Sequence, residues 1–231
     1  MMNGKLQLPS VTLLTATSVD FDNAQLALLL SSMHVEFGAI KMLSSDYPLE
    51  RHSHIRYERI PEMDFLGYSR FMLEELHNFV DTPHCLIVQA DGFVLSPQNW
   101  NPAFLEFDYI GAPWPETLLI QPGNGTLALG NNRVGNGGFS LRSRKLLEAT
   151  AQVNFDDLDF PIKSEDLVIC HYLGAEMQAT GIRFAPLDLA AQFSIESGDN
   201  LHGQTLKSVF GFHGKHWRDA LFRHARQLMH R

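Results

Sequence analysis

Apolar and polar positions alternate along the first part of the chain with the periods of strands and helices. Residues 11–17 form a short run of β-branched and apolar side chains, which predicts a strand. Asp20 or Asp22 then stands where it can cap the first turn of a helix. The apolar positions of this helix follow helical spacing at Leu26, Leu29, Leu30 and Met33. The pattern therefore predicts a strand that leads into a helix.

Two further strands and another helix follow. Residues 39–43 predict a second strand, residues 68–79 a helix, and residues 85–88 a buried strand that ends in a polar cluster. This order of strands and helices favours a parallel α/β sheet. No internal repeat or linker composition divides the chain, so we expect residues 1–231 to form a single domain.

The pattern is looser in the middle of the chain. Residues 107–111 predict a strand, and prolines then bound a long loop that runs from Pro113 through Gly130. Loops of this length are usually functional or mobile. Residues 139–141 predict the next strand.

Three helices are expected to complete the chain. Ser143 can cap a helix over residues 144–151, and Ser164 can cap one over residues 165–180. The last helix spans about residues 215–230, is basic, and has an apolar face. It could contact anionic lipid headgroups or diphosphates, or it could pack its apolar stripe on the body of the protein and leave its charges in solvent.

Composition and charge narrow the class of protein. With 45% hydrophobic and 19% charged residues, the chain can build a sizeable core, which excludes long disorder. A formal net charge of −8 argues against nucleic acid as the main partner. Any anionic ligand has to be met by a local group of cations.

The cysteines and the apolar segments bear on the compartment. Cys85 and Cys170 lie far apart in apolar settings, which indicates neither a disulfide framework nor a cysteine zinc site and fits a reducing cytoplasm. The most apolar region, residues 24–43, is interrupted by polar side chains. We therefore expect no signal peptide and no membrane span, and a cytoplasmic protein.

Asp91 is the first candidate for chemistry. It follows the strand at residues 85–88, and open α/β sheets bind ligands at the carboxyl ends of their strands. A carboxylate there can hold a divalent cation that bridges a diphosphate. The alternative is an ordinary Asp-Gly turn after a strand.

A glycine-rich run leads into the strand at residues 139–141. Gly137 and Gly138 lack Cβ atoms and so allow a sugar or phosphate to approach backbone N–H groups. The run is not a dinucleotide fingerprint, because it opens a strand and no helix. A tight turn with a bulge is the alternative.

Glu165 and Asp166 place two carboxylates in the first turn of a predicted helix. They could serve as general base and as acceptor of a hydrogen bond from a sugar hydroxyl. They could equally do no more than stabilise the helix dipole.

Two histidines and two tryptophans complete the candidates. His213 and His216 stand three residues apart and could complete a metal site begun by Asp91, although with 11 histidines in the chain a pair is weak evidence. Trp100 and Trp114 could stack on sugar rings or serve as aromatic anchors.

Five motifs taken together resemble a known family. Their residues are 85–92, 108–114, 134–143, 165–166 and 210–214. In this order they resemble the bacterial glycosyltransferase-like domain of surface-polysaccharide gene clusters, which is similar to GT-A glycosyltransferases of the β-galactosyltransferase type. The resemblance covers most of the chain. It implies a Rossmann-like GT-A domain with a mixed, mainly parallel central sheet flanked by helices.

The resemblance also implies roles for the candidate residues. Asp91 matches the last acid of a D-x-D metal motif, and Gln89 stands where the first aspartate is usual, which weakens the negative charge offered to a metal. His213 and His216 match downstream metal ligands. The glycine pair Gly137 and Gly138 lies near the donor sugar, and the acidic pair Glu165 and Asp166 supplies acceptor contact and base.

The expected reaction is sugar transfer from a nucleoside diphosphate sugar, a UDP-sugar being favoured, to a hydroxyl of a saccharide or lipid-linked saccharide. Mn²⁺ or Mg²⁺ would help the diphosphate leave. The expected base is Asp166, the expected acceptor contacts are Glu165 or Trp114, and inversion is the expected outcome. The expected donor contacts at the first strands are Thr15, Thr17 and Ser45.

Two alternatives to this transferase stay open. One is a catalytically degenerate module of the same fold that binds sugar or nucleotide, motivated by Gln89. The other is a metal-dependent transferase or hydrolase that acts on nucleotide sugars without an acceptor. The last helix would allow peripheral contact with the inner face of the membrane.

Overall fold

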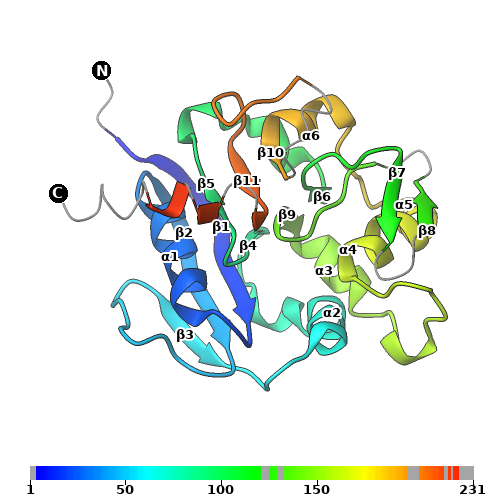
Figure 1. Ribbon diagram of the computed structural model, residues 1–231, viewed down its shortest axis with the longest axis horizontal. Helices are drawn as coiled ribbons and strands as arrows, with labels where there is room; N and C mark the ends of the chain where they lie inside the picture. Colours follow the sequence, from blue (N-terminus) through cyan, green and yellow to red (C-terminus); the bar gives the residue numbers. More distant parts are fainter. Residues whose placement is uncertain are drawn as a thin grey trace.

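A six-stranded sheet with the order β3-β2-β1-β4-β9-β6 forms the centre of the molecule (Figure 1). The computed structural model describes residues 4–120, 125–129, 133–196, 203–215, 218–219 and 221–223. The strands of the sheet are β1 (Leu6–Thr17), β2 (Val35–Ser44), β3 (Arg56–Arg59), β4 (His84–Val88), β6 (Tyr109–Ile110) and β9 (Phe139–Ser143). Strands β1 to β4 are parallel, and β9 runs antiparallel to both of its neighbours. The predicted α/β class and the strands at residues 11–17, 39–43, 85–88 and 139–141 are confirmed.

Helices cover both faces of the parallel half of the sheet. Leu13 and Leu14 of β1 are both fully buried, and because they are neighbours on a strand they point to opposite faces. Leu13 belongs to the apolar cluster that includes α1 (Phe21–Ser32), whereas Leu14 packs in a second cluster with α2 (Phe65–Glu74). Burial on both faces explains the continuous apolar run of β1.

The first helix is confirmed, but its capping differs from the prediction. Asp20 occupies the N-cap position in the left-handed region at φ 52° and makes no side-chain cap bond. Its carboxylate instead accepts from the side-chain amide of Asn23 at 2.8 Å, and the Asp22 carboxylate accepts from the Leu49 amide at 3.0 Å. Neither aspartate side chain therefore accepts a hydrogen bond from a backbone amide of the first helical turn.

The helix predicted over residues 68–79 is divided. It forms as α2, whose N-cap Asp64 accepts from the Gly67 amide at 2.7 Å, followed by the 3₁₀ turn η1 (Leu76–Phe79). The helix after β9 is α3 (Arg144–Thr150), and its predicted cap is confirmed, because Ser143 Oγ accepts from the Leu146 amide at 3.0 Å.

The single helix predicted over residues 165–180 is wrong. The segment forms α4 (Glu165–Leu167), the π-helical turn η5 (Val168–Tyr172) and α5 (Gly174–Ala179). The Ser164 side chain makes no cap bond. Helical spacing of the apolar side chains alone does not reveal such a change of helical type.

The predicted loop from Pro113 through Gly130 contains an antiparallel pair that was not predicted, β7 (Thr117–Ile120) with β8 (Gly125–Ala128). The strand expected over residues 107–111 is confirmed in shorter form as β6. For the last helix, the structure describes helical residues at 215, 218–219 and 221–223, and the rest of 215–230 lies outside the described residues.

A smaller three-stranded sheet was not predicted. It joins β10 (Ser194–Ile195), β11 (Gly211–His213) and β5 (Gly92–Val94) in that order. The helix α6 (Leu187–Phe193) leads into β10, and the connection after β5 contains the 3₁₀ turns η2 (Pro97–Asn99) and η3 (Pro102–Glu106). A further 3₁₀ turn, η4 (Phe155–Asp157), follows α3.

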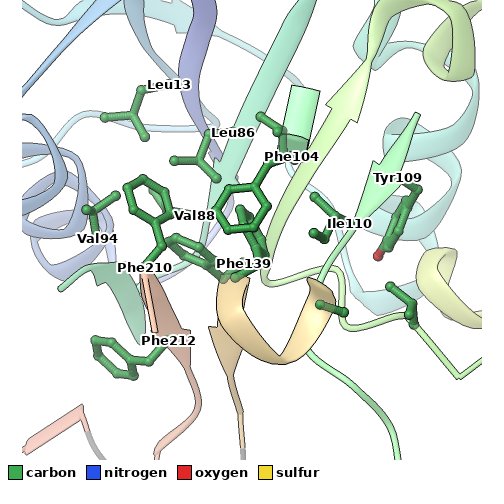
Figure 2. Close-up of a cluster of buried hydrophobic side chains, with 14 of the residues drawn as sticks. Leu13, Leu86, Val88, Val94, Phe104, Tyr109, Ile110, Phe139, Phe210 and Phe212 are labelled. Carbon is green, nitrogen blue, oxygen red and sulfur yellow. The ribbon is translucent and has the colours of Figure 1, made fainter. Parts of the chain in front are cut away.

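An aromatic cluster fastens the two sheets together. Figure 2 shows Phe104, Phe139 and Phe210 side by side, and all three are fully buried together with Phe193. The ring centroids of Phe139 and Phe210 are 6.1 Å apart, and those of Phe104 and Phe193 are 5.2 Å apart. Because Phe210 immediately precedes β11, this packing holds β11 beside the end of β4.

No helix in the described part of the chain is long and apolar enough to cross a membrane.

Candidate functional site

Three polar side chains meet at the carboxyl end of β4. Asp91 Oδ1 lies 3.1 Å from His213 Nε2, and the same nitrogen lies 3.1 Å from Gln89 Oε1. The backbone fixes this arrangement, because the Gly214 amide donates to the Asp91 carbonyl at 3.0 Å and the Gln89 amide donates to the Gly138 carbonyl at 3.0 Å. The structure thus brings Asp91 and His213 together, whereas His216 lies outside the described residues.

The His213 ring lies between two carboxylates. Its Nδ1 is 3.3 Å from Glu196 Oε1, on the side opposite Asp91. Burial alone would lower the pKa of His213, but hydrogen bonds to Asp91 and Glu196 outweigh it and raise the pKa to about 10. For Asp91, burial raises the pKa, and the contact with His213 more than offsets it, so that the pKa is lowered. The His213 imidazolium and the Asp91 carboxylate are therefore both charged at neutral pH.

Tyr68 of α2 orients Gln89. The Gln89 side-chain amide donates to the Tyr68 hydroxyl at 2.9 Å, which turns its carbonyl oxygen toward His213. Burial and the nearby Glu165 carboxylate raise the pKa of Tyr68, so the phenol stays neutral. Gln89 consequently offers an oxygen at the place where an aspartate was expected.

The glycine run passes directly over this group. A Cβ atom on Gly138 would lie 2.1 Å from His213 Nε2, and one on Gly137 would lie 1.9 Å from Glu165 Oε1. No side chain can be accommodated at either position. Asn136, next in the run, has a φ of 62°, so the backbone turns sharply there.

The two adjacent acids occupy different environments. Glu165 is buried and forms an ion pair with Arg142 of β9 at 3.0 Å. Burial and the neighbouring Asp166 raise the pKa of Glu165. Asp166 is partly exposed, and its carboxylate accepts from the amides of Gly137 at 3.1 Å and Leu167 at 2.8 Å. Only Asp166 therefore keeps a solvent-facing carboxylate.

A cavity of about 520 Å³ opens beside Asp91. The carboxyl ends of β1 and β4 and the beginning of α2 form its walls, and Lys215 and Arg218 line it as well. Thr15 and Thr17 line the cavity, whereas Ser45 is fixed next to it by its amide, which donates to the Thr17 carbonyl at 3.3 Å.

The cavity has polar and apolar sides. Thr15 Oγ1 is buried and has no hydrogen-bond partner among the described residues. Val19 and Phe65 also line the cavity, with 70% and 63% of their surfaces exposed. A flat ring with polar edges, such as a nucleobase, matches this combination.

Trp114 lies apart from the cavity. It is 5% exposed, and its ring packs so closely on Gly135 that a Cβ there would lie 2.1 Å from it. Trp100 is likewise in an aromatic contact, 5.0 Å from the Phe210 ring centroid. Both rings are packed within the protein.

The donor set at Asp91 fits part of a cation site. Asp91 Oδ1 and Gln89 Oε1 each lie 3.1 Å from His213 Nε2. The ring nitrogen can join the two oxygens as a cation ligand only after the imidazolium loses its proton. Mg²⁺ ions in nucleotide sites typically take one or two protein carboxylates and complete their shell with phosphates and water. Over the described ranges no group of three or more His, Cys, Asp or Glu side chains is arranged to hold a metal, and Glu196 faces the far side of the His213 ring.

Several residues of the site were missed by the sequence analysis. Tyr68 and Glu196 carry no sequence signal, since each reaches the site from an element distant in sequence. Arg142 does carry a sequence signal, because it is a charged residue in a buried strand, on the same strand face as Ser140.

Solved structures that are similar in fold to this chain include glycosyltransferases. The chain is 15% identical to a glycosyltransferase involved in the glycosylation of the major capsid of PBCV-1, with a TM-score of 0.51, covering 93% of this chain and 98% of that one. GlyE from Streptococcus pneumoniae gives 14% identity and a TM-score of 0.48, covering 87% of this chain and 53% of that one. The mannosyltransferase PcManGT from Pyrobaculum calidifontis, in complex with GDP-Man and Mn²⁺, gives 10% and 0.46, covering 80% and 58%. The chain thus spans a little over half the length of the last two.

The likeness with a TM-score above 0.5 concerns the fold alone. The mixed α/β sheet, with a cavity at the carboxyl ends of its parallel strands, is similar in fold to the glycosyltransferase involved in the glycosylation of the PBCV-1 capsid. No curated protein matches the chain in sequence. Residues 54–213 match the family described as "Protein of unknown function (DUF5672)", and the chain belongs to that family.

Proposed function

We propose that this protein is a glycosyltransferase that uses a nucleoside diphosphate sugar. The observation that carries the proposal is the cavity beside Asp91, which opens where Asp91, His213 and the glycine run meet. A UDP-sugar is the favoured donor, and the acceptor is a saccharide or lipid-linked saccharide of bacterial surface-polysaccharide synthesis. We propose the β-galactosyltransferase type, because the order of the motifs in this sequence resembles that type.

The donor lies in the cavity with its base toward Val19 and Phe65 and its diphosphate toward Asp91. Thr15 and Thr17 contact the base or ribose, and Lys215 and Arg218 face the cavity with positive charge. When bound, Mn²⁺ or Mg²⁺ held by Asp91 and His213 supplies a Lewis acid that neutralises the leaving diphosphate.

Asp166 is the general base of the proposed reaction. The acceptor hydroxyl oxygen forms a bond to the anomeric carbon while the bond from that carbon to the diphosphate oxygen breaks, and the hydroxyl proton passes to the Asp166 carboxylate. Attack from the face opposite the leaving group inverts the anomeric configuration. The ion pair with Arg142 occupies Glu165, which leaves its neighbour for proton transfer.

Nucleotide binding tests the proposal first. UDP and GDP are titrated by calorimetry into the protein with and without Mn²⁺, and into Asp91→Ala and Asp159→Ala. We expect cation-dependent binding to weaken about tenfold or more in Asp91→Ala, equivalent to about 1.4 kcal/mol. The exposed Asp159 is a matched control, and its variant should bind like the wild type. Absence of binding of either nucleotide to the folded wild type would contradict the proposal.

Turnover tests the role of Asp166. In Asp166→Asn we expect kcat to fall by about 10²–10⁴-fold, the usual contribution of general acid–base catalysis, while UDP binding is retained. Near-normal turnover of this variant would remove Asp166 from the mechanism.

A binding module of the same fold is the second candidate. Gln89 favours it, because its carbonyl oxygen already has a partner in His213 and its amide has one in Tyr68. The module would bind nucleotide or sugar and release no product. Product analysis with a panel of nucleotide sugars separates it from a transferase, and also from a hydrolase, which would release free sugar without an acceptor.

A further inference from the structure

Arg142 takes part in a closed ring of contacts around Gly137. Its Nη2 donates to Glu165 at 3.0 Å and its Nε donates to Ser140 Oγ at 3.1 Å. Ser140 Oγ in turn donates to the Gly137 carbonyl at 3.0 Å. The Gly137 amide donates to Asp166, the residue that follows Glu165, and this closes the ring.

Support of the fold does not require a charge at this position. Arg142 is fully buried in the middle of β9, with the Tyr109 ring 5.3 Å from its guanidinium carbon. Its Nη1 has no hydrogen-bond partner among the described residues. A buried ion pair can often be replaced by apolar groups of similar volume without loss of stability. The guanidinium therefore has to be explained by something besides stability.

The groups of this ring are packed so closely that a displacement of one group moves its neighbours. A Cβ on Gly137 would lie 1.9 Å from Glu165 Oε1 and 2.9 Å from Arg142 Nη2, so the backbone of the glycine run rests on the ion pair itself. The next residue, Gly138, rests in the same way on His213. A shift of the ion pair therefore displaces the glycine run, and with it the amide that holds Asp166.

We propose that Arg142 is a positioning residue, which holds the Asp166 carboxylate and the glycine run in a fixed relation through Glu165 and Ser140. The guanidinium suits this task because it is a rigid planar fork whose Nε and Nη2 donate at a fixed angle to Ser140 and Glu165, whereas a lysine ammonium on a flexible stem does not fix this geometry. Arg142 itself touches no substrate. The inference rests on the proposed function in so far as Asp166 is its base.

The experiment separates the charge of the Arg142 side chain from its geometry and measures the effect of each on turnover. The double variant Arg142→Met/Glu165→Gln removes both charges at similar volume, and Arg142→Lys keeps the charge without the fork. The control Arg144→Met changes a half-buried arginine two residues away, which pairs with Glu148 outside the ring of contacts. Urea unfolding, calorimetric UDP binding and steady-state transfer are measured for each variant.

We expect the double variant to unfold near the wild-type midpoint and to bind UDP within about twofold, while kcat falls about 10²-fold, as a misplacement of about 1 Å can cause. KM for the donor should stay unchanged. Arg142→Lys should lose kcat in the same way, and Arg144→Met should not. A kcat of the double variant within about threefold of the wild type would overturn the proposal, because a purely structural role predicts that recovery.

Two further readouts keep the test decisive. If the double variant does not fold, Ser140→Ala opens the ring at a single hydroxyl and should lower kcat about tenfold with UDP binding retained, a loss of about 1.4 kcal/mol. Wild-type turnover in Ser140→Ala would then reject the proposal. If the wild type transfers no sugar, the proposed function fails, and amide hydrogen exchange of Gly137 decides about Arg142 independently. Exchange should accelerate at least about tenfold in the ring variants, and unchanged exchange would overturn the positioning role.

Discussion

Neighbouring carboxyl groups of this protein differ because their surroundings differ. Glu165 is buried in an ion pair with Arg142, and Asp91 contacts the His213 imidazolium. The partly exposed Asp166 accepts hydrogen bonds from two backbone amides. Hydrogen bonds to the charged form lower the pKa of a carboxyl, whereas burial raises it. The choice of Asp166 as base of the proposed reaction rests on its access to an acceptor hydroxyl, because Glu165 is enclosed with Arg142.

The two cysteines provide a prediction at the residue scale. Burial raises the pKa of Cys85 to about 12 and raises the pKa of Cys170 well above its usual range. Because the thiolate is the reactive form, neither thiol should react with a disulfide reagent such as DTNB in the native protein at pH 8. Both should react once the protein is unfolded in urea. Rapid labelling of either thiol in the native state would show that the packing around it opens easily.

Sequence reasoning found those site residues that follow directly on a patterned element. Asp91 was found because it comes after an apolar strand, and the glycine run because it precedes one. Tyr68 and Glu196 could not be found, since their roles depend on contacts across 21 and 17 residues that no local pattern encodes. The sequence also could not separate the enclosed Glu165 from the partly exposed Asp166, because the burial of Glu165 depends on its contact with Arg142 of the distant strand β9.

At the scale of elements, the segment after Ser164 departs most from its prediction. Three helical types follow one another in α4, η5 and α5. Single π-helical turns are uncommon and are frequent near functional sites. Here the π-helical turn begins at Val168, two residues after Asp166, and directly follows the short helix α4 that carries the acidic pair.

Two serines in equivalent sequence settings give a matched prediction. Ser143 Oγ accepts from Leu146 and donates to the buried Asp108 at 2.6 Å, whereas the Ser164 side chain makes no cap bond. We expect Ser143→Ala to lower the free energy of unfolding by about 1–2 kcal/mol, and Ser164→Ala to change it by less than about 0.5 kcal/mol. Urea unfolding of both variants checks the difference. Equal effects would contradict the assignment of the two caps.

The elements that were missed are short or weakly patterned. Strands β10 and β11 have two and three residues, too few for an alternating pattern to stand out. Their pairing is imposed by the buried aromatic residues beside them. Long apolar strands such as β1 and β4 were found for the opposite reason.

For the whole molecule, the aromatic cluster links core and site. Phe210 contacts the rings of Phe104, Phe139, Phe193 and Trp100, with a centroid distance of 5.0 Å to Trp100. It also precedes the strand that carries His213. Packing in the core therefore sets the position of the imidazole.

Phe210→Ala tests this link. Removal of a fully buried ring should lower the free energy of unfolding by about 3–5 kcal/mol, measured by urea unfolding, because a cavity remains. UDP binding in the folded variant should weaken as well, since β11 loses its anchor. Leu119→Ala serves as the control, because Leu119 is 79% exposed and its loss should cost less than about 0.5 kcal/mol. Unchanged stability of Phe210→Ala would show that the cluster does not fasten the sheets.

Gln89 and His213 are in contact but lie 124 residues apart in the sequence, so the ribosome makes them at different times. At about 5–20 residues per second, on the order of ten seconds of translation separate the two side chains. A nascent chain that has emerged through β9 already contains all strands of the large sheet, but Asp91 has no imidazole beside it. His213 therefore joins Asp91 and Gln89 only after all strands of the large sheet have been synthesised.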